Sequence, residues 1–156
     1  MLQLKRQKVF FEEGICFECQ RCGVCCTGEP GVVFVHQSEV AVIAGFMKIE
    51  ESHLIRRYLY PFQDHYSIRE DREGACLFYD NGCRIYPVRP EQCRTYPFWF
   101  QNLRSVERWQ KVAKECPGIG KGRRYGQEEI LKLMEPTLNR SIMIQRRHLV
   151  PDVFSL

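Results

Sequence analysis

The stretch that decides the fold runs from Cys16 to Cys26, "CFECQRCGVCC", and places five cysteines in eleven residues. Two residues between neighbouring cysteines allow both thiolates to turn toward one ion, with the intervening backbone N–H groups free to point at the sulfur atoms. The remaining cysteines follow singly, beside turns and prolines: Cys76, Cys83, Cys93 and Cys116. One Cys-x2-Cys pair would indicate little, but three overlapping pairs together with four solitary cysteines predict a metal site.

The doublet Cys25–Cys26 ends this stretch. Adjacent side chains in an extended segment point to opposite sides and still diverge in other conformations, so we expect the two cysteines to serve two neighbouring metal centres, or one of them to bridge. Eight of the nine cysteines would make two sets of four. We expect the N-terminal run to supply half of each shell and the later cysteines to complete it. Metal binding would then stabilise the fold by on the order of 10 kcal/mol per structural zinc site.

Disulfides and buried free cysteines are the alternatives to a metal site. The N-terminus, "MLQLKRQKVFFEEG", lacks the apolar segment of a secretory signal, and no later apolar run approaches membrane-spanning length. We therefore expect a cytoplasmic protein without a membrane segment, whose thiols stay reduced. An odd number of cysteines also cannot all pair within one chain. Buried free cysteines acting as small hydrophobic side chains would explain one or two of them.

Length and composition indicate a folded α+β protein. The chain of 156 residues fits a single domain over 1–156, and its 44% hydrophobic and 27% charged residues are typical of a soluble fold. A short strand is predicted at 32–35, a helix after Ser38 as N-cap, and a second helix over 51–60 that Pro61 ends. We expect a small, irregular, Cys-rich metal-binding domain with a β-hairpin and packed helices.

The second half of the chain carries the hairpin and the longest helix. Asn81-Gly82 favours a tight turn between two β-prone runs over 75–86. Three prolines over 87–97 exclude a long regular element and predict a compact loop or one-turn helix that carries Cys93. The pattern over 126–147 predicts a helix bent or interrupted at Pro136. No internal repeat is apparent.

The charge is concentrated near the C-terminus. Seven basic and three acidic residues over 121–147 account for the whole net charge of +4. A basic stretch can bind nucleic acid or another acidic partner, but a base-stacking surface would require several interleaved aromatic residues, and Tyr125 is the only aromatic residue over 121–147. We favour a solvated helix face over a nucleic-acid-binding surface, and leave a protein partner open.

Three motifs together resemble the YkgJ-type cysteine-cluster proteins, described as carrying a zinc- or iron-chelating domain. The motifs are "CQRCGVCC" at 19–26, "CLFYDNGCRIYPVRPEQCRTYP" at 76–97, and Cys116-Pro117. Similar cysteine segments occur in flagellin lysine N-methylases. The resemblance covers a Cys-rich zinc/iron-chelating region over 11–120, followed by a basic C-terminal helical extension over 121–156. It implies eight metal ligands and leaves Cys16 outside the pattern: Cys19, Cys22, Cys25, Cys26, Cys76, Cys83, Cys93 and Cys116.

The sequence leaves two cofactors open. Solitary cysteines from separate loops suit an iron–sulfur cluster at least as well as zinc, so an iron–sulfur cluster is slightly favoured and Zn²⁺ is the alternative. A two-cluster ferredoxin would repeat its motif and place proline where Thr27 stands. The arginines beside the ligand segments could offset the thiolate charge and donate hydrogen bonds to sulfur. They are Arg21, Arg84, Arg89 and Arg94.

Three functions agree with these observations. The first is a metal-binding protein that stores, delivers or structurally uses its metal. The second is an iron–sulfur enzyme component in redox chemistry or protein methylation, for which the sequence offers no nucleotide-binding loop and no acid–base pair. The third is a metal-stabilised adaptor that binds nucleic acid or protein through its basic helix. The four histidines are scattered, and we expect structural or exposed roles for them: His36, His53, His65 and His148.

Overall fold

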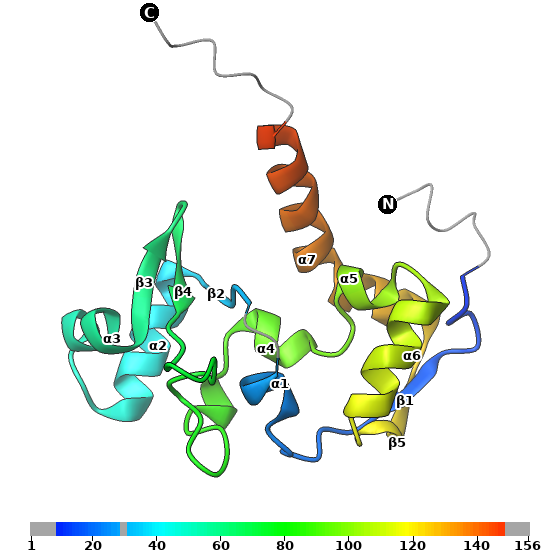
Figure 1. Cartoon of the computed structure of the whole chain (residues 1–156), viewed down its shortest axis with the longest axis horizontal. Coiled ribbons are helices and arrows are strands. Elements are labelled where there is room, and N and C mark those ends of the chain that lie inside the picture. Colours follow the sequence, from blue (N-terminus) through cyan, green and yellow to red (C-terminus); the bar gives the residue numbers. More distant parts are fainter. Residues whose placement is uncertain (1–8, 29–30, 149–156) are drawn as a thin grey trace, which may run out of the picture. The chain divides into compact units, whose positions relative to one another are not determined.

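The structure, a computed structural model, describes residues 9–28 and 31–148, with side chains up to residue 140. Two compact units divide the described chain (Figure 1). The "cysteine unit" comprises the described residues of Cys19–Tyr96 and Glu115–Pro117, and the "terminal unit" those of Met1–Glu18, Pro97–Lys114 and Gly118–Leu156. Helices and small antiparallel sheets occur together, which confirms the α+β class.

The cysteine unit contains a three-stranded antiparallel sheet in the order β2-β4-β3. Its strands are β2 (Phe34–Val35), β3 (Leu59–Phe62) and β4 (His65–Ile68), and β3 and β4 form a hairpin. Helices α2 (Gln37–Met47) and α3 (Glu51–Tyr58) contribute the other large share of the core. The buried side chains of this core are Val35, Val40, Ile43, Ala44, Leu54, Tyr58, Leu59, Ile68, Phe78 and Ile85.

Both predicted helices of this unit are present, with shifted ends. The N-cap of α2 is His36 and not Ser38, because the carboxylate of Glu39 accepts the backbone N–H of His36 at 2.9 Å and closes a capping box. Helix α3 ends at Tyr58, before the expected residue 60. Strand β3 begins at Leu59 and contains Pro61, which an edge strand tolerates because one side of its backbone lacks a partner strand.

The predicted hairpin over 75–86 forms only its turn. Asn81 and Gly82 both have positive φ, at 51° and 151°, as a tight turn requires. An isolated bridge joins Tyr79 and Cys83, but no strands flank it, because the chain already turns where the N–H of Tyr79 donates to the carbonyl of Cys76 at 2.8 Å. The expected strands are therefore replaced by a loop, and the hairpin of the fold is β3–β4.

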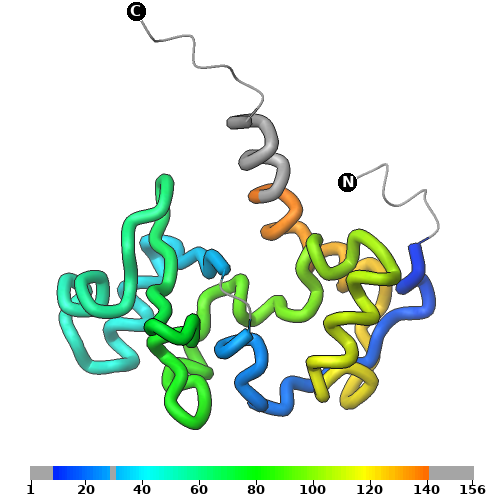
Figure 2. The backbone as a smooth tube through the Cα atoms, viewed as in Figure 1, coloured from blue at the N-terminus to red at the C-terminus, as the bar shows by residue number. Residues whose placement is uncertain are grey.

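Three short helical turns complete the cysteine unit. They are α1 (Val24–Thr27), η2 (Tyr86–Val88) and α4 (Glu91–Thr95). The one-turn helix expected around Cys93 is confirmed as α4. Figure 2 allows these turns to be followed as short coils of the tube between longer irregular segments.

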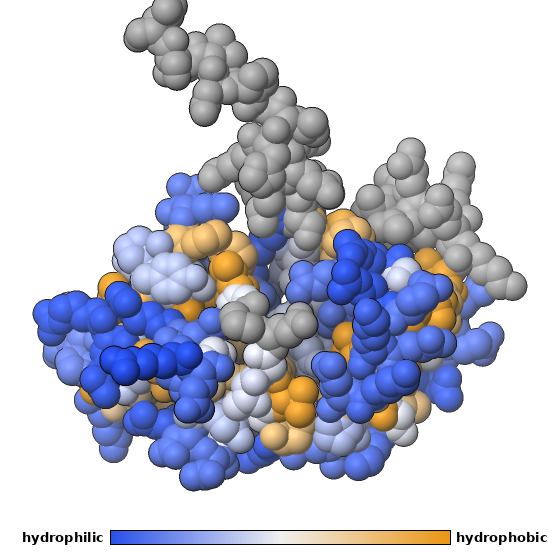
Figure 3. All heavy atoms as spheres, viewed as in Figure 1, coloured by the Kyte–Doolittle hydropathy of each residue, from blue (hydrophilic) through white to orange (hydrophobic). Residues whose placement is uncertain are grey.

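The terminal unit is built on a two-stranded antiparallel sheet, β1 (Ile15–Phe17) with β5 (Ile119–Tyr125). Helices α5 (Phe100–Leu103), α6 (Val106–Glu115, whose last residue belongs to the cysteine unit) and α7 (Gln127–His148) accompany it. Its buried core residues are Phe11, Phe98, Leu103, Ile130, Leu131 and Met134. None of the residues of α6 is buried, and hydrophilic side chains dominate the part of this helix seen in Figure 3.

The region expected to be a basic helical extension is a strand followed by a helix. Residues up to Tyr125 belong to β5, and α7 begins at Gln127. Pro136 lies inside α7, which continues past it, and residues 149–156 lie outside the described residues. No helix within the described ranges is both long and apolar enough to cross a membrane.

Gly45 offers a simple test of α2. It is exposed within the helix, and a Cβ added there would meet no atom within 4 Å. We expect Gly45→Ala to raise the free energy of unfolding by about 0.5–1 kcal/mol, because alanine loses less backbone entropy than glycine in a helix. Urea denaturation followed by circular dichroism measures the change. A lower stability would contradict the assigned geometry of α2.

Candidate metal centre

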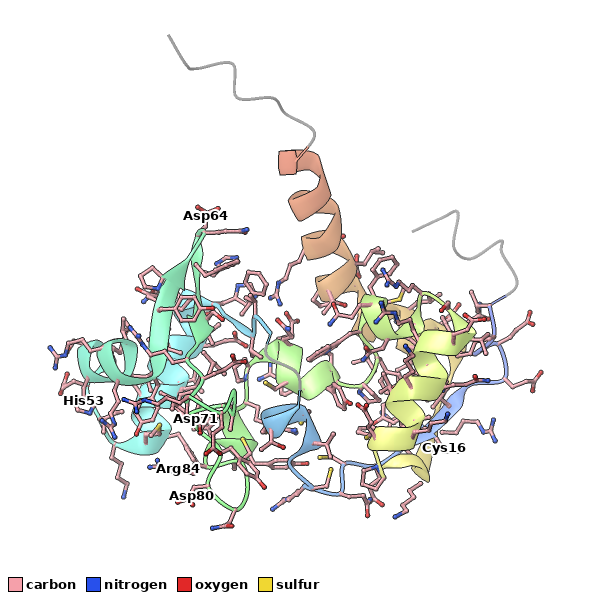
Figure 4. All side chains as sticks on the ribbon, in the orientation of Figure 1. Cys16, His53, Asp64, Asp71, Asp80 and Arg84 are labelled. Atoms are coloured by element: carbon pink, nitrogen blue, oxygen red, sulfur yellow. The ribbon has the colours of Figure 1, made fainter. Side chains whose placement is uncertain are left out.

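The eight cysteines implied as ligands all belong to the cysteine unit, and Cys16 alone belongs to the terminal unit. Cys16 lies on β1, where its backbone is the register partner of Arg124 (Figure 4). All nine cysteines are free thiols in this structure. The two units therefore separate Cys16 from the same eight cysteines that the motif resemblance implies as ligands.

Helix α1 carries the doublet. Its N-cap, Gly23, has φ 79°, and the Gly23 carbonyl accepts the N–H groups of Cys26 at 2.8 Å and Thr27 at 3.0 Å. A Cβ on Gly23 would come within 2.4 Å of the ring of Tyr79, so this ring lies directly against the glycine. Both the φ angle and the close approach require glycine at this position.

The sulfur atoms of Cys25 and Cys26 lie 4.0 Å apart. The expectation that the two side chains diverge is therefore wrong for this segment, because the helical turn of α1 brings the two sulfur atoms together. Two sulfur atoms bound to one tetrahedral zinc ion lie about 3.8 Å apart, given Zn–S bonds of about 2.3 Å. The spacing of the two sulfur atoms thus allows them to bind two neighbouring metal ions or the same ion.

The loop that follows β4 approaches α1 through the backbone. The N–H of Cys76 donates to the carbonyl of Cys26 at 2.8 Å, and the thiols of Cys26 and Cys83 share a hydrogen bond. The loop is attached to the core by Phe78, which is fully buried and stacks on Tyr58 with ring centroids 4.7 Å apart. Local packing therefore fixes the segment that presents Cys76 and Cys83.

Helix α4, which carries Cys93, is held by two polar side chains. The buried amide of Gln92 accepts the N–H of Phe34 at 3.1 Å and donates to the carbonyl of Val32 at 2.9 Å. The carboxylate of Glu39 accepts the N–H of Glu91 at 2.7 Å. These bonds connect α4 to β2 and to the first turn of α2, so the position of Cys93 depends on the sheet.

The thiols influence each other electrostatically. The hydrogen bond with Cys26 lowers the pKa of Cys25 and of Cys83, and the guanidinium of Arg89 lowers both further. The same hydrogen bonds raise the pKa of Cys26, so the shared proton stays on its sulfur. Burial raises the pKa of Cys76 to about 11 and also raises that of Cys93. The thiolate forms of these buried cysteines would need a nearby cation.

A second region of the unit surrounds Tyr86. Its hydroxyl shares a hydrogen bond with the thiol of Cys19, and this bond raises the pKa of Tyr86. The guanidinium carbons of Arg21 and Arg89 lie 4.1 Å and 3.7 Å from the ring centroid. Cation–π contacts of this kind hold the two guanidinium groups near Cys19 without pairing them with a carboxylate.

Tyr96 lies beside three further thiols. Burial raises its pKa first, and the thiols of Cys116, Cys25 and Cys22 raise it further. Cys116 is itself buried, whereas Cys22 and Cys25 are exposed. Tyr96 therefore marks a place where the N-terminal cysteine run meets the last cysteine of the unit.

The tyrosines belong to a repeat that the sequence analysis missed. "Cys-Arg-x-Tyr-Pro" occurs twice, at 83–87 and at 93–97. Each copy supplies a cysteine, an arginine and a tyrosine, and the structure places both tyrosines beside thiols from other segments. The ten-residue spacing of the two copies was the signal that could have identified Tyr86 and Tyr96 as neighbours of the thiols.

The donor set fits a thiophilic cation, although the thiols do not form a closed shell. Among the described residues, no group of three or more His, Cys, Asp or Glu side chains could hold a metal ion in the arrangement shown. The rings of His36 and His65 lie 4.6 Å apart, and His36 Nε2 is 3.9 Å from a carboxylate oxygen of Glu91. His53 is exposed on α3, and the side chain of His148 lies outside the described residues. Sulfur is thus the donor type that predominates, and it suits zinc and iron.

The fold and the site define a class of protein: an α+β protein in which eight of nine thiols belong to one unit. The chain belongs to the family described as "CxxCxxCC: Putative zinc- or iron-chelating domain", which matches residues 18–117. This match confirms the resemblance to the YkgJ-type cysteine-cluster proteins and supports metal chelation.

One relative and the solved structures complete the comparison. The chain is 33% identical over 104 residues to "Uncharacterized protein MJ0661" of Methanocaldococcus jannaschii, a stretch that covers 63% of this chain. The matched stretch spans 55% of the length of that relative. No solved structure matches the chain.

Proposed function

We propose that the protein binds metal ions through the thiolates of the eight cysteines of the cysteine unit. The observation that carries this proposal is the distribution of the thiols, since eight of the nine belong to one compact unit and Cys16 to the other. Membership of a zinc- or iron-chelating family supports the same chemistry. The protein would store, deliver or structurally use the metal.

Thiol contacts favour single tetrahedral ions over cube-shaped clusters. The thiol of Cys26 is hydrogen-bonded to that of Cys83, so two sulfur atoms from segments far apart in the sequence lie close together. Sulfur atoms around one zinc ion are in contact at about 3.8 Å, whereas cysteines on one iron–sulfur cluster bind different iron atoms and stand farther apart. We therefore propose Zn²⁺ or mononuclear iron first and an iron–sulfur cluster second.

Anaerobic purification followed by elemental analysis and a visible spectrum tests the proposal. We expect a colourless protein with zinc, or a pale one with iron and no sulfide, and about two ions per chain if each takes four thiolates. A brown protein that releases sulfide would favour the iron–sulfur cluster. Cys16→Ser should keep its full metal content. A protein without stoichiometric metal, in a preparation whose thiols are reduced, would overturn the proposal.

Arg89 is expected to strengthen metal binding. Its guanidinium interacts with the thiols of Cys25, Cys83 and Cys93, and its Nε donates to the carbonyl of Tyr86 at 3.0 Å. Without it, the negative charge of a thiolate centre would lack a positive neighbour that interacts with three of its thiols. We expect Arg89→Gln to weaken the affinity for zinc by about tenfold or more, as measured by competition with a chromophoric chelator.

Arg84→Gln is the matched control for this substitution. The substitution removes the same charge from the same part of the chain, but the side chain of Arg84 is exposed (Figure 4). Its loss should change the zinc affinity little, because solvent screens exposed charges. Equal weakening in both variants would show that the net charge matters and not the position of Arg89.

A further inference from the structure

The eight cysteines of the unit fall into two sets. The "loop set" consists of Cys26, Cys76, Cys83 and Cys93. The carbonyl of Cys26 accepts the N–H of Cys76 at 2.8 Å, and its thiol is hydrogen-bonded to that of Cys83. The thiol of Cys93 interacts electrostatically with those of Cys76 and Cys83, and also with that of Cys25, whose sulfur lies beside that of Cys26. Backbone and side-chain contacts therefore join α1, the loop after β4, and α4 at one place.

The "knuckle set" consists of Cys19, Cys22, Cys25 and Cys116. Its first three members are separated by two residues each, which is the spacing that allows neighbouring thiolates to turn toward one ion. Cys22, Cys25 and Cys116 all interact with the phenol of Tyr96, and the thiol of Cys19 is hydrogen-bonded to Tyr86. This set thus combines the N-terminal run with the last cysteine of the unit.

The repeated Cys-Arg-x-Tyr-Pro segment follows the same division. In each copy the cysteine, Cys83 or Cys93, belongs to the loop set. The tyrosine three residues later interacts with the knuckle set, Tyr86 through a hydrogen bond with Cys19 and Tyr96 electrostatically with Cys22, Cys25 and Cys116. Each copy of the repeat therefore supplies a cysteine to the loop set and a tyrosine that interacts with the knuckle set.

The two sets differ in their access to solvent. Cys22 and Cys25 of the knuckle set are exposed, although Cys116 is buried, whereas no member of the loop set is exposed. The loop set is also attached to the core, since fully buried Phe78 lies between Cys76 and Cys83 in the chain. An ion in the loop set could leave only with disturbance of this packing, while an ion in the knuckle set would present two of its ligands to solvent.

We propose that the two sets form two adjacent metal centres, that the loop set retains its ion structurally, and that the knuckle set exchanges its ion with external chelators. The inference rests on the proposed function. The doublet contributes one sulfur to each centre, and the 4.0 Å between these sulfur atoms makes the centres neighbours. The N-terminal run then supplies three ligands to one shell and one to the other, and not two to each. Exchange moves the ion without any change in its oxidation state.

Metal release from the intact zinc-loaded protein tests the inference. Excess 4-(2-pyridylazo)resorcinol should remove the zinc in two phases of equal size, one ion in each. Alkylation with iodoacetamide at the end of the fast phase, followed by mass spectrometry, should label the knuckle set and spare the loop set. Release in a single phase, or labelling that mixes the two sets, would overturn the inference. A protein that carries no zinc or iron from the start would instead overturn the proposed function.

Serine variants of the doublet provide a second test. Cys25→Ser should lose the fast-exchanging ion alone, and adding Cys22→Ser should remove nothing more. Cys26→Ser should lose the slowly exchanging ion, as should Cys83→Ser, and the double variant of Cys25 and Cys26 should lose both. Should Cys25→Ser and Cys26→Ser lose the same ion, the division of the doublet is wrong. The labelling of the wild-type protein remains decisive for any variant that does not fold.

Discussion

Removal of the metal by a chelator under reducing conditions is expected to unfold α1, the loop after β4, and α4, while α2 and α3 stay folded. Binding at a structural zinc site is worth on the order of 10 kcal/mol, and this free energy is coupled to the folding of the segments that supply the ligands. The loop after β4 and the turn of α1 contain few buried apolar residues besides Phe78 and Ile85. Helices α2 and α3 would lose Phe78 and Ile85 from their shared core, but they keep its other buried members, which come from the two helices and the sheet.

Hydrogen exchange measures this prediction segment by segment. Amide protons over 24–27 and 76–95 should exchange much faster in the chelated protein than in the loaded one. Those of α2, α3 and α7 should change little, and α7 of the terminal unit serves as the internal control. Uniform loss of protection across the chain would mean that the metal stabilises both units together. Unchanged exchange at 76–95 would mean that the cysteine segments fold without a metal.

The sequence predicted the parts of the fold that local patterns determine. The apolar spacing of Val40, Ile43 and Ala44 identified α2, and all three side chains are buried. The β3–β4 hairpin escaped prediction because its turn has no Asn-Gly signal and Gln63 adopts φ 54° there. Pro61 appeared to end a helix and instead lies in an edge strand. An isolated proline does not distinguish these two outcomes.

Long-range pairing accounts for the other differences. Strand β5, "IGKGRRY", has little β propensity, and its partner β1 lies more than a hundred residues earlier in the chain. Nothing local to residues 119–125 indicates such a partner. The helical extension expected over 121–156 therefore included residues 121–125, which belong to β5. By contrast, the position of α7 followed from its helical periodicity, and Pro136 did not interrupt it.

Spacing alone identified the cysteines but not their surroundings. The grouping of eight cysteines apart from Cys16 came from motif resemblance, and the two units of the chain separate the same residues. The contributions of Gln92 and Glu39 could not be predicted, because their hydrogen bonds join segments about fifty to sixty residues apart. The divergence expected for Cys25 and Cys26 did not allow for the turn of α1, in which the two sulfur atoms lie 4.0 Å apart.

Phe78→Ala is expected to destabilise the cysteine unit by about 3–5 kcal/mol and to lower its metal content. Phe78 is 0% exposed and stacks on Tyr58 at an interplanar angle of 11°. Its removal leaves a cavity and costs the transfer free energy of the ring. Because Phe78 also attaches the loop between Cys76 and Cys83 to the core, its loss should weaken binding at those thiols. Urea denaturation and elemental analysis of the same preparation measure the two effects.

Phe98→Ala is the matched control, since Phe98 is 1% exposed in the core of the terminal unit. The ring is the same and the expected cost is again about 3–5 kcal/mol, but no predicted ligand depends on it. The control should therefore lose stability and keep its metal. If both variants lose metal equally, metal content reports overall folding and the attachment of the cysteine loop by Phe78 has no special part in it. If Phe78→Ala alone loses metal, packing beneath the loop is what presents Cys76 and Cys83 to the ion.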